Sequence, residues 1–176
     1  MYHAVNRGSR KGVLFSNSEE YSAFERLLAQ GREHHPVRII CYCLMPNHWH
    51  LLLWPQADGQ LSKYLHWVTG THAARWRRRS NTVGQGAVYQ SRFRHVPVRD
   101  YVQLLATWRY IERNPVGGRL ASRAELWEWS SAAHLIRTKP ELRLDNGPIA
   151  RPVDWLEIVN QEDTVPLMMV IDRLDR

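Results

Sequence analysis

Two histidines separated by a single residue are the first feature of the sequence that could carry out chemistry. His48 and His50 flank Trp49 in an apolar run that predicts a β-strand. Because side chains alternate along a strand, both imidazoles project from one face, about 7 Å apart at the backbone, and two nitrogens can bind one metal ion. Strand histidines are more often surface or hydrogen-bonded residues, so the pair alone favours a structural role over a metal site.

A tyrosine and an asparagine one helical turn apart form a second candidate group. In the helix predicted over residues 100–114, Tyr110 lies about 200° around the axis from Trp108, nearly opposite the apolar stripe. Asn114 follows at i+4 and shares this polar face, which would place a hydroxyl nucleophile beside an amide-oxygen ligand. The alternative is an exposed tyrosine, with Asn114 ending the helix before Pro115.

The positive charge comes mostly from arginine and is concentrated in one part of the chain. The net charge is +7, and 21 of the 24 cationic residues are arginine. Residues 1–138 carry +10 and residues 139–176 carry −3, while residues 61–99 hold eight cationic residues and no carboxylate. Arginine binds phosphate through two donors and stacks on bases, so this pattern predicts a nucleic-acid partner.

Seven residues in the basic region are candidate DNA contacts. Six are arginines suited to the phosphate backbone, and one is a loop tyrosine suited to stacking on a base. Arginines at a helix end also stabilise the helix dipole and keep the surface solvated, so each has an alternative role. The candidates are Arg75, Arg77, Arg78, Arg79, Tyr89, Arg92 and Arg94.

The elements that must position these groups follow from hydrophobic periodicity and turn residues. The predicted order is strand, helix, strand, strand, helix, strand, helix, which is the βαββαβα order of a ferredoxin-like antiparallel sheet in the α+β class. The strands are predicted at residues 2–6, 37–45, 48–54 and 95–98, and the helices at 16–34, 61–79 and 100–114. Further helical segments are predicted at residues 126–137 and 153–159.

The length and composition indicate one main domain, residues 1–138, and an acidic, proline-containing C-terminal appendage, residues 139–176. An apolar content of 44% excludes a disordered chain. The apolar runs are too short to span a membrane, no signal peptide is predicted, and a cytoplasmic location is expected. Cys41 and Cys43 are expected to be reduced core residues.

Several motifs together resemble those of the single-tyrosine HUH transposases. The segments MPNHWHLLL, GAVYQSRFRHVPV and YIERNPVGG occur in the family's order, and the likeness extends over about residues 2–135. The opening YHAVNRG and the segment WEWSSAAHL point to the REP-associated tyrosine transposase branch. The resemblance implies a ferredoxin-like sheet with the histidines on a central strand and the tyrosine on a helix.

By this resemblance, Tyr110 is the catalytic nucleophile, and His48, His50 and Asn114 bind a divalent metal ion, Mg²⁺ or Mn²⁺. The implied activity is cleavage and rejoining of single-stranded DNA at palindromic, hairpin-forming repeats through a 5′-phosphotyrosine intermediate. The implied protein is nucleoid-associated and is a monomer or a homodimer. Two alternatives stay open: a repeat-binding protein without catalytic activity, and a zinc hydrolase in which His48 and His50 activate water.

Overall fold

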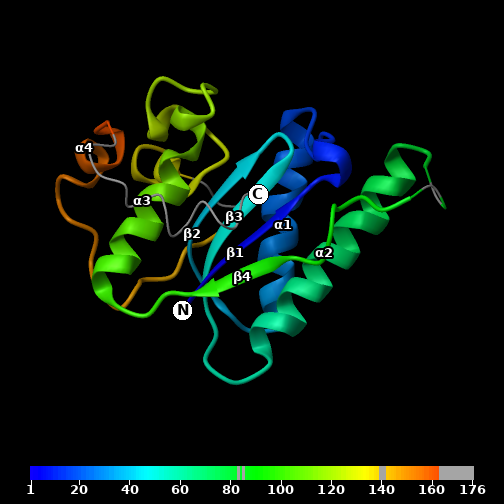
Figure 1. The fold of residues 1–176 in the computed structure, drawn as a ribbon, viewed down its shortest axis with the longest axis horizontal. Helices are drawn as coiled ribbons and strands as arrows, with labels where there is room; N and C mark the ends of the chain where they lie inside the picture. Colours follow the sequence, from blue (N-terminus) through cyan, green and yellow to red (C-terminus); the bar gives the residue numbers. More distant parts are fainter. Residues whose placement is uncertain (83, 85, 139–141, 163–176) are drawn as a thin grey trace.

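A four-stranded antiparallel sheet forms the centre of the molecule (Figure 1). Its strand order is β2-β3-β1-β4, which makes β1 and β3 the central strands. The strands are β1 (Tyr2–Arg7), β2 (Arg38–Met45), β3 (His48–Trp54) and β4 (Arg94–Pro97). The structure, a computed structural model, describes residues 1–82, 84, 86–138 and 142–162.

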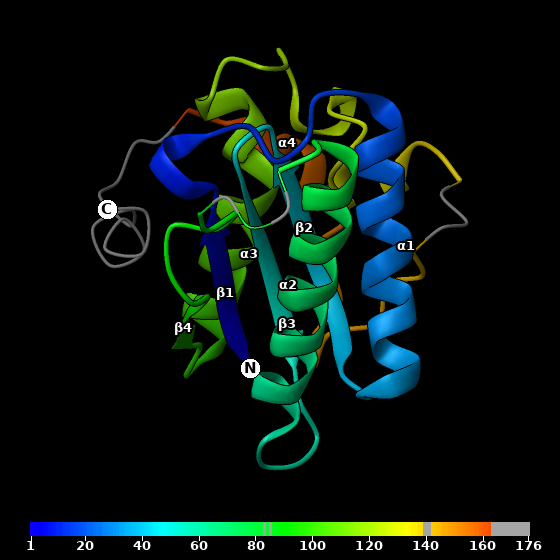
Figure 2. The same cartoon turned by 90° about the vertical axis from the view of Figure 1, so that its right-hand side faces the viewer.

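Helices cover both faces of this sheet. Helices α1 (Ser18–His34) and α2 (Gln60–Arg79) pack on one face, and α3 (Tyr101–Gly117) packs on the other (Figures 1 and 2). Side-chain alternation along β3 divides the core, since Leu51 contributes to the cluster under α1 and α2 while Leu52 contributes to the cluster under α3. The predicted ferredoxin-like α+β fold is confirmed.

Helix α3 begins where the sequence predicts and continues beyond the predicted end. The Asp100 carboxylate accepts a hydrogen bond from the Gln103 amide at 2.8 Å, which caps the first turn. Pro115 lies inside the last turn, where the missing amide hydrogen removes only one helical bond. The helix closes when the Gly118 amide donates to the Asn114 carbonyl at 2.8 Å. A Cβ at Gly118 would lie 2.8 Å from Met45 Cε, so only glycine fits this close approach without displacing Met45.

The prediction of a helix at residues 126–137 is wrong. The chain forms two short 3₁₀ turns there, η2 (Ala124–Leu126) and η3 (Ser131–Leu135). Between them the backbone pairs with the edge strand β2, where the Leu44 amide donates to the Trp129 carbonyl at 2.8 Å and Cys43 bridges Ser130. Backbone groups committed to the sheet edge cannot form a continuous helix.

The described part of the C-terminal appendage, residues 142–162, packs against the rest of the protein. The Asp145 amide donates to the Ile39 carbonyl at 2.8 Å, and Leu142 is buried in the cluster under α1 and α2. The predicted short helix exists as α4 (Trp155–Asn160), and it packs against α3. The boundary at residue 138 stays a prediction, although this part of the tail shares the core of residues 1–138. No helix in the described ranges is long and apolar enough to cross a membrane.

Candidate active site

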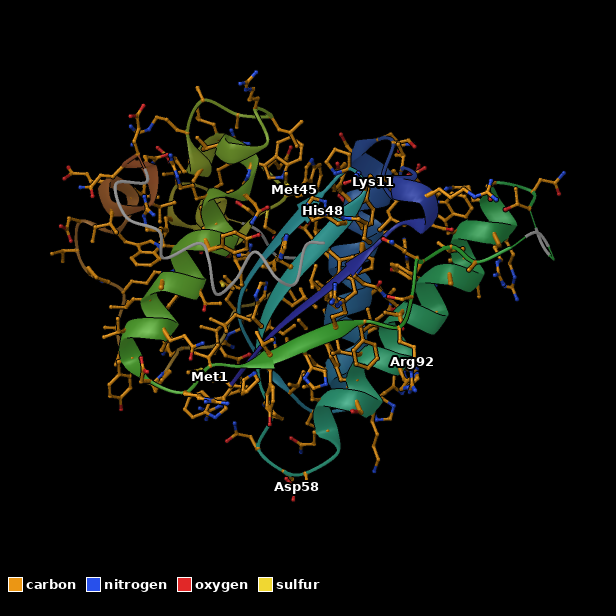
Figure 3. All side chains as sticks on the ribbon, in the orientation of Figure 1. Met1, Lys11, Met45, His48, Asp58 and Arg92 are labelled. Carbon is orange, nitrogen blue, oxygen red and sulfur yellow. The ribbon has the colours of Figure 1, made fainter. Side chains whose placement is uncertain are left out.

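The two histidines of β3 project from the sheet face that α3 covers. His50 is fully buried and pairs in register with Val5 of β1, while His48 is half-buried and pairs with Arg7. Their ring centroids are 5.0 Å apart and the ring planes are nearly perpendicular, at 87°. The side chain of His48 lies at the end of β3 next to the β2–β3 connection, close to Met45 (Figure 3). One end of the sheet therefore carries both imidazoles.

Helix α3 places the predicted tyrosine and asparagine against these histidines. The Tyr110 ring meets the His50 ring edge-on, with centroids 5.6 Å apart at 87°. The Asn114 side chain hydrogen-bonds to His48, and its Nδ2 donates to the Tyr110 carbonyl at 3.0 Å. Since the amide nitrogen is engaged by the helix, the amide oxygen is the group that remains for the histidine side. The structure thus brings together all four residues predicted for catalysis and metal binding.

The face of α3 that meets the sheet differs from the predicted one. Helical spacing from Trp108 puts Tyr101 on the apolar stripe that is predicted to pack on the sheet, yet Tyr101 is 62% exposed. Tyr110 is predicted opposite this stripe, yet it faces the histidines. The buried side of α3 includes Thr107, at 2% exposure, together with Trp108. Compared with the predicted orientation, α3 is rotated about its axis so that Thr107 lies on the buried side. The neighbouring side of the helix, which carries Tyr110, therefore faces β1 and β3. A helical stripe defined by apolar residues alone misses a threonine that is packed against the sheet.

Burial keeps both β3 histidines in their neutral form. Burial, and next the positive charge of Arg7, lower the pKa of His48 to about 4, against a small opposing effect of the Asn114 hydrogen bond. Burial also lowers the pKa of His50 well below its usual 6.5, followed by the nearby His48, His3 and Arg7. A neutral imidazole is the form that binds a metal ion, so both side chains are ready to bind one at neutral pH.

A third histidine, His3 of β1, lies against the pair, and sequence reasoning did not identify it. It is fully buried, and its Nε2 lies 3.0 Å from Nδ1 of His50, within hydrogen-bond distance. Its ring is 5.9 Å from the Tyr110 ring. Burial lowers the pKa of His3 to about 3. The strand order of a ferredoxin-like sheet places β1 beside β3, but the strand register was also needed to bring His3 next to His50.

The donors at the site fit a divalent metal ion only if Asn114 takes part. In the ranges that the structure describes, no three His, Cys, Asp or Glu side chains are arranged to hold a metal. Two neutral imidazoles and one amide oxygen would leave several positions for water or phosphate oxygens. Such a mixed nitrogen and oxygen set is compatible with Mg²⁺ or Mn²⁺.

The arginines predicted to contact DNA come from α2, from the segment before β4 and from β4 itself, and Arg94 is aligned with His50 across the sheet because both residues pair with Val5. The four at the C-terminal end of α2 are on the opposite side of the sheet from α3 (Figure 2). Arg79 forms an ion pair with Glu20 at 3.0 Å, and Arg77 donates to the Gly86 carbonyl. Arg92 donates to Nε2 of His66 at 2.7 Å, and Arg94 is exposed on β4 in register with Val5. Their DNA-binding role stays a prediction.

Tyr89 has a position that does not suit the predicted stacking on a base. It is 8% exposed, and its ring packs edge-on against Trp49. Its hydroxyl hydrogen-bonds to Nδ1 of His72 at 2.7 Å and accepts from the Trp49 indole at 3.3 Å. The prediction is corrected because the ring is part of the core under α2 and presents no open face to a nucleotide.

Comparison with known proteins identifies a family that matches this chain and solved structures with a similar fold. The family described as "Transposase IS200 like" matches residues 1–114. No curated protein matches the chain. A REP-associated tyrosine transposase bound to a REP hairpin has a similar structure, with a TM-score of 0.62, 18% identity, and coverage of 82% of this chain and 84% of that one. A candidate transposase from Deinococcus radiodurans aligns with a TM-score of 0.46 and 19% identity, over 63% of this chain and 87% of that one.

The matched residues 1–114 contain all four strands, both β3 histidines, Tyr110 and Asn114. The resemblance seen in the sequence motifs is therefore confirmed at the level of the family. The chain belongs to the IS200-like transposase family.

Proposed function

We propose that this protein is a metal-dependent strand transferase that cuts and rejoins single-stranded DNA at hairpin-forming palindromic repeats. The observation that carries the proposal is the meeting of Tyr110 and Asn114 on α3 with His48 and His50 on β3, in a chain of a transposase family. A fold shared with a REP-associated tyrosine transposase bound to a REP hairpin supports the REP-associated branch and a hairpin substrate.

Tyr110 is the proposed nucleophile. Its hydroxyl loses a proton and attacks the phosphorus in line, while the bond between phosphorus and the 3′ oxygen breaks. The 3′ oxygen takes up a proton and leaves as a hydroxyl, and the 5′ phosphate remains on the tyrosine as an ester. Attack by another 3′ hydroxyl reverses these steps, joins two strands and restores Tyr110. Rejoining needs no nucleoside triphosphate, because the phosphotyrosine ester retains the free energy of the phosphodiester bond that was cut.

His48, His50 and Asn114 are the residues that would hold Mg²⁺ or Mn²⁺, which would supply Lewis-acid stabilisation of negative charge on the scissile phosphate. Arg7 pairs with His48 in the sheet, and its positive charge reaches both β3 histidines. The same charge favours a phosphate at this end of the sheet. Because His50 is fully buried, the inner side of the site is closed to bulk water.

The arginines outside the site would hold the DNA. In this proposal the phosphate backbone of a hairpin binds the arginines near the end of α2, which are Arg75, Arg77, Arg78 and Arg79. Arg94 begins the edge strand β4, and Arg92 lies two residues before it and donates to His66 of α2. A DNA strand that crosses the β4 edge would contact both groups and reach Tyr110.

A covalent-trapping experiment tests the proposal. A labelled hairpin oligonucleotide with single-stranded flanks is incubated with the protein and Mn²⁺ and analysed on a denaturing gel. We expect a slowly migrating protein–DNA adduct that Tyr110→Phe abolishes without loss of hairpin binding. Tyr101→Phe is the matched control, because this tyrosine lies on the same helix but is 62% exposed.

Each other outcome identifies an alternative. An adduct that survives Tyr110→Phe would assign the nucleophile to another residue. Cleavage without any adduct would indicate a hydrolase that activates water at His48 and His50. Hairpin binding without cleavage in any tested metal would indicate a repeat-binding protein that does not cut.

A further inference from the structure

We infer that His3 is a positioning residue that fixes the tautomer of His50, so that His50 presents Nε2 to a metal ion. The inference deepens the proposed function and rests on its metal site. His3 would not touch the metal or the DNA, and it would act only through His50.

The contact between the two histidines is direct and enclosed. Nε2 of His3 lies 3.0 Å from Nδ1 of His50, both side chains are fully buried, and the ring centroids are 5.2 Å apart with an interplanar angle of 29°. Water therefore has no ready access to replace this hydrogen bond. The pairing joins the two central strands, with His3 on β1 and His50 on β3.

The position of one hydrogen atom decides whether His50 can bind a metal. A neutral imidazole carries a single N–H, on Nδ1 or on Nε2. If His50 donates from Nδ1 to Nε2 of His3, the lone pair of His50 Nε2 is available to a metal ion. If His3 donates instead, the hydrogen of His50 lies on Nε2 and blocks that atom. Metal binding through Nε2 is therefore compatible only with His3 as the acceptor.

The other nitrogen of His3 supports a role beyond packing. With Nε2 as the acceptor, the hydrogen of His3 lies on Nδ1, and Nδ1 is buried with no hydrogen-bond partner among the described residues. A buried polar atom without a partner costs free energy, and an apolar side chain of the same size would avoid this cost. Groups that hydrogen-bond to the second nitrogen of a metal-binding histidine commonly fix its tautomer and orientation.

Two substitutions of His3 distinguish the effect of its hydrogen-bond acceptor from the effect of the size of its ring. His3→Gln keeps an amide oxygen that can reach the position of Nε2 and accept from His50. His3→Phe keeps an aromatic ring of similar size next to Tyr110 but has no acceptor. His95→Phe is the matched control, because His95 is an exposed histidine on β4 in register with Ala4, on the face that α1 and α2 cover.

Mn²⁺ binding to the DNA-free protein, measured by isothermal titration calorimetry, is the primary readout. We expect His3→Phe to weaken binding by about 10- to 100-fold, in the range typical for loss of such a partner. The Mn²⁺ affinities of His3→Gln and His95→Phe should remain close to that of the wild-type protein. Equal binding by His3→Phe and wild type would overturn the inference, and so would equal weakening by His3→Phe and His3→Gln, which would indicate packing alone.

Nitrogen-15 NMR of the histidines in metal-free wild-type protein keeps the inference testable if His3→Phe does not fold. We expect the proton of His50 on Nδ1, and a proton on Nε2 would overturn the assignment. Failure of the proposed function is distinguishable, because it appears as the absence of a Tyr110–DNA adduct while the metal affinities still follow the order expected for His3. An unchanged Mn²⁺ affinity in His3→Phe alongside a normal adduct would reject only the role of His3.

Discussion

Three buried or half-buried histidines lie side by side where a positive imidazolium would be unfavourable. Burial is the largest cause of the lowered pKa of His3, His48 and His50, and the positive charge of Arg7 acts in the same direction on the two β3 histidines. A cluster that excludes protons at neutral pH is suited to accept a metal ion. The same cluster makes the protein sensitive to acid.

In metal-free protein, we expect the free energy of unfolding to fall as the pH drops below 6.5. The folded-state pKa is about 3 for His3 and about 4 for His48, and the unfolded value is 6.5 for each, so between these values the unfolded chain binds more protons. The contribution of these groups is fully present above pH 6.5. At pH 5, His3 alone should lower the stability by about 2 kcal/mol relative to pH 8.

Urea unfolding at a series of pH values in the presence of EDTA measures this effect. His3→Gln is the matched variant. Between pH 8 and pH 5, its free energy of unfolding should fall less than that of the wild-type protein, by about the 2 kcal/mol assigned to His3. Parallel curves for the two proteins would show that His3 is not the source of the acid sensitivity.

At the scale of elements, α3 is held from both sides. One face packs on the sheet, and the fully buried Glu112 carboxylate, near Cys41 and Cys43 of β2, joins the helix to Ser131 and to the C-terminal segment. This carboxylate accepts from the Trp155 indole at 2.6 Å, the Ser131 hydroxyl at 2.5 Å and Arg151 at 2.8 Å. The network fixes the helix that carries Tyr110.

Removing the Glu112 carboxylate should destabilise the protein strongly. Glu112→Ala leaves Arg151, whose side chain is 18% exposed, without its partner and breaks hydrogen bonds to two indoles. We expect a loss of about 3–5 kcal/mol in the free energy of unfolding, measured by urea denaturation. Adding Arg151→Met to the Glu112→Ala background should restore part of the stability, because the arginine is then no longer buried without its carboxylate. Losses that simply add would argue against an energetic coupling between the two residues.

The sequence predicted elements well where local signals and tertiary packing agree. Alternation identified the strands, and Asp100 marked the start of α3. Prediction failed at residues 126–137 because pairing of Ser130 with β2 is a long-range contact without a local signal. It also misjudged the side of α3 that carries Tyr110, because Thr107 packs against the sheet despite its polar type.

At the scale of the whole molecule, the sheet separates two regions that the proposed DNA substrate must contact together. The Tyr110 site lies between the sheet and α3, while the arginines of α2 lie on the other side (Figures 1 and 2). A hairpin bound by the arginines and a single strand that reaches Tyr110 would need to pass around the β4 edge. Arg94, the first residue of β4, is exposed at that edge, and Arg92 lies next to His66 of α2 just before it.

An exposed arginine of α2 tests this arrangement. Arg78→Ala should weaken hairpin binding for all sequences and reduce the slope of log affinity against log salt by about 1, because one phosphate contact is lost. Fluorescence anisotropy over a range of salt concentrations measures the slope. Arg26→Ala, an exposed arginine on α1, is the control. An unchanged slope for Arg78→Ala would remove this residue from the interface.

The candidate site was predictable from sequence only in part. His48 and His50 share a strand, and Tyr110 and Asn114 share a helix, so each pair follows from local periodicity. The contact between the two pairs depends on the fold, and only the resemblance to a known family predicted that the four residues form one site. His3 was not identified and Tyr89 was assigned to a base contact, because the pairing of β1 with β3 and the packing of residue 89 on His72 are set by tertiary structure.

The identity of the residue joined to DNA tests the central claim most directly. Wild-type protein, a hairpin oligonucleotide and Mn²⁺ are incubated, digested with nuclease and trypsin, and analysed by mass spectrometry. We predict a nucleotide attached through its 5′ phosphate to Tyr110, in the tryptic peptide of residues 110–113. Nicked DNA with no modified peptide, or a nucleotide on any other residue, would contradict the account.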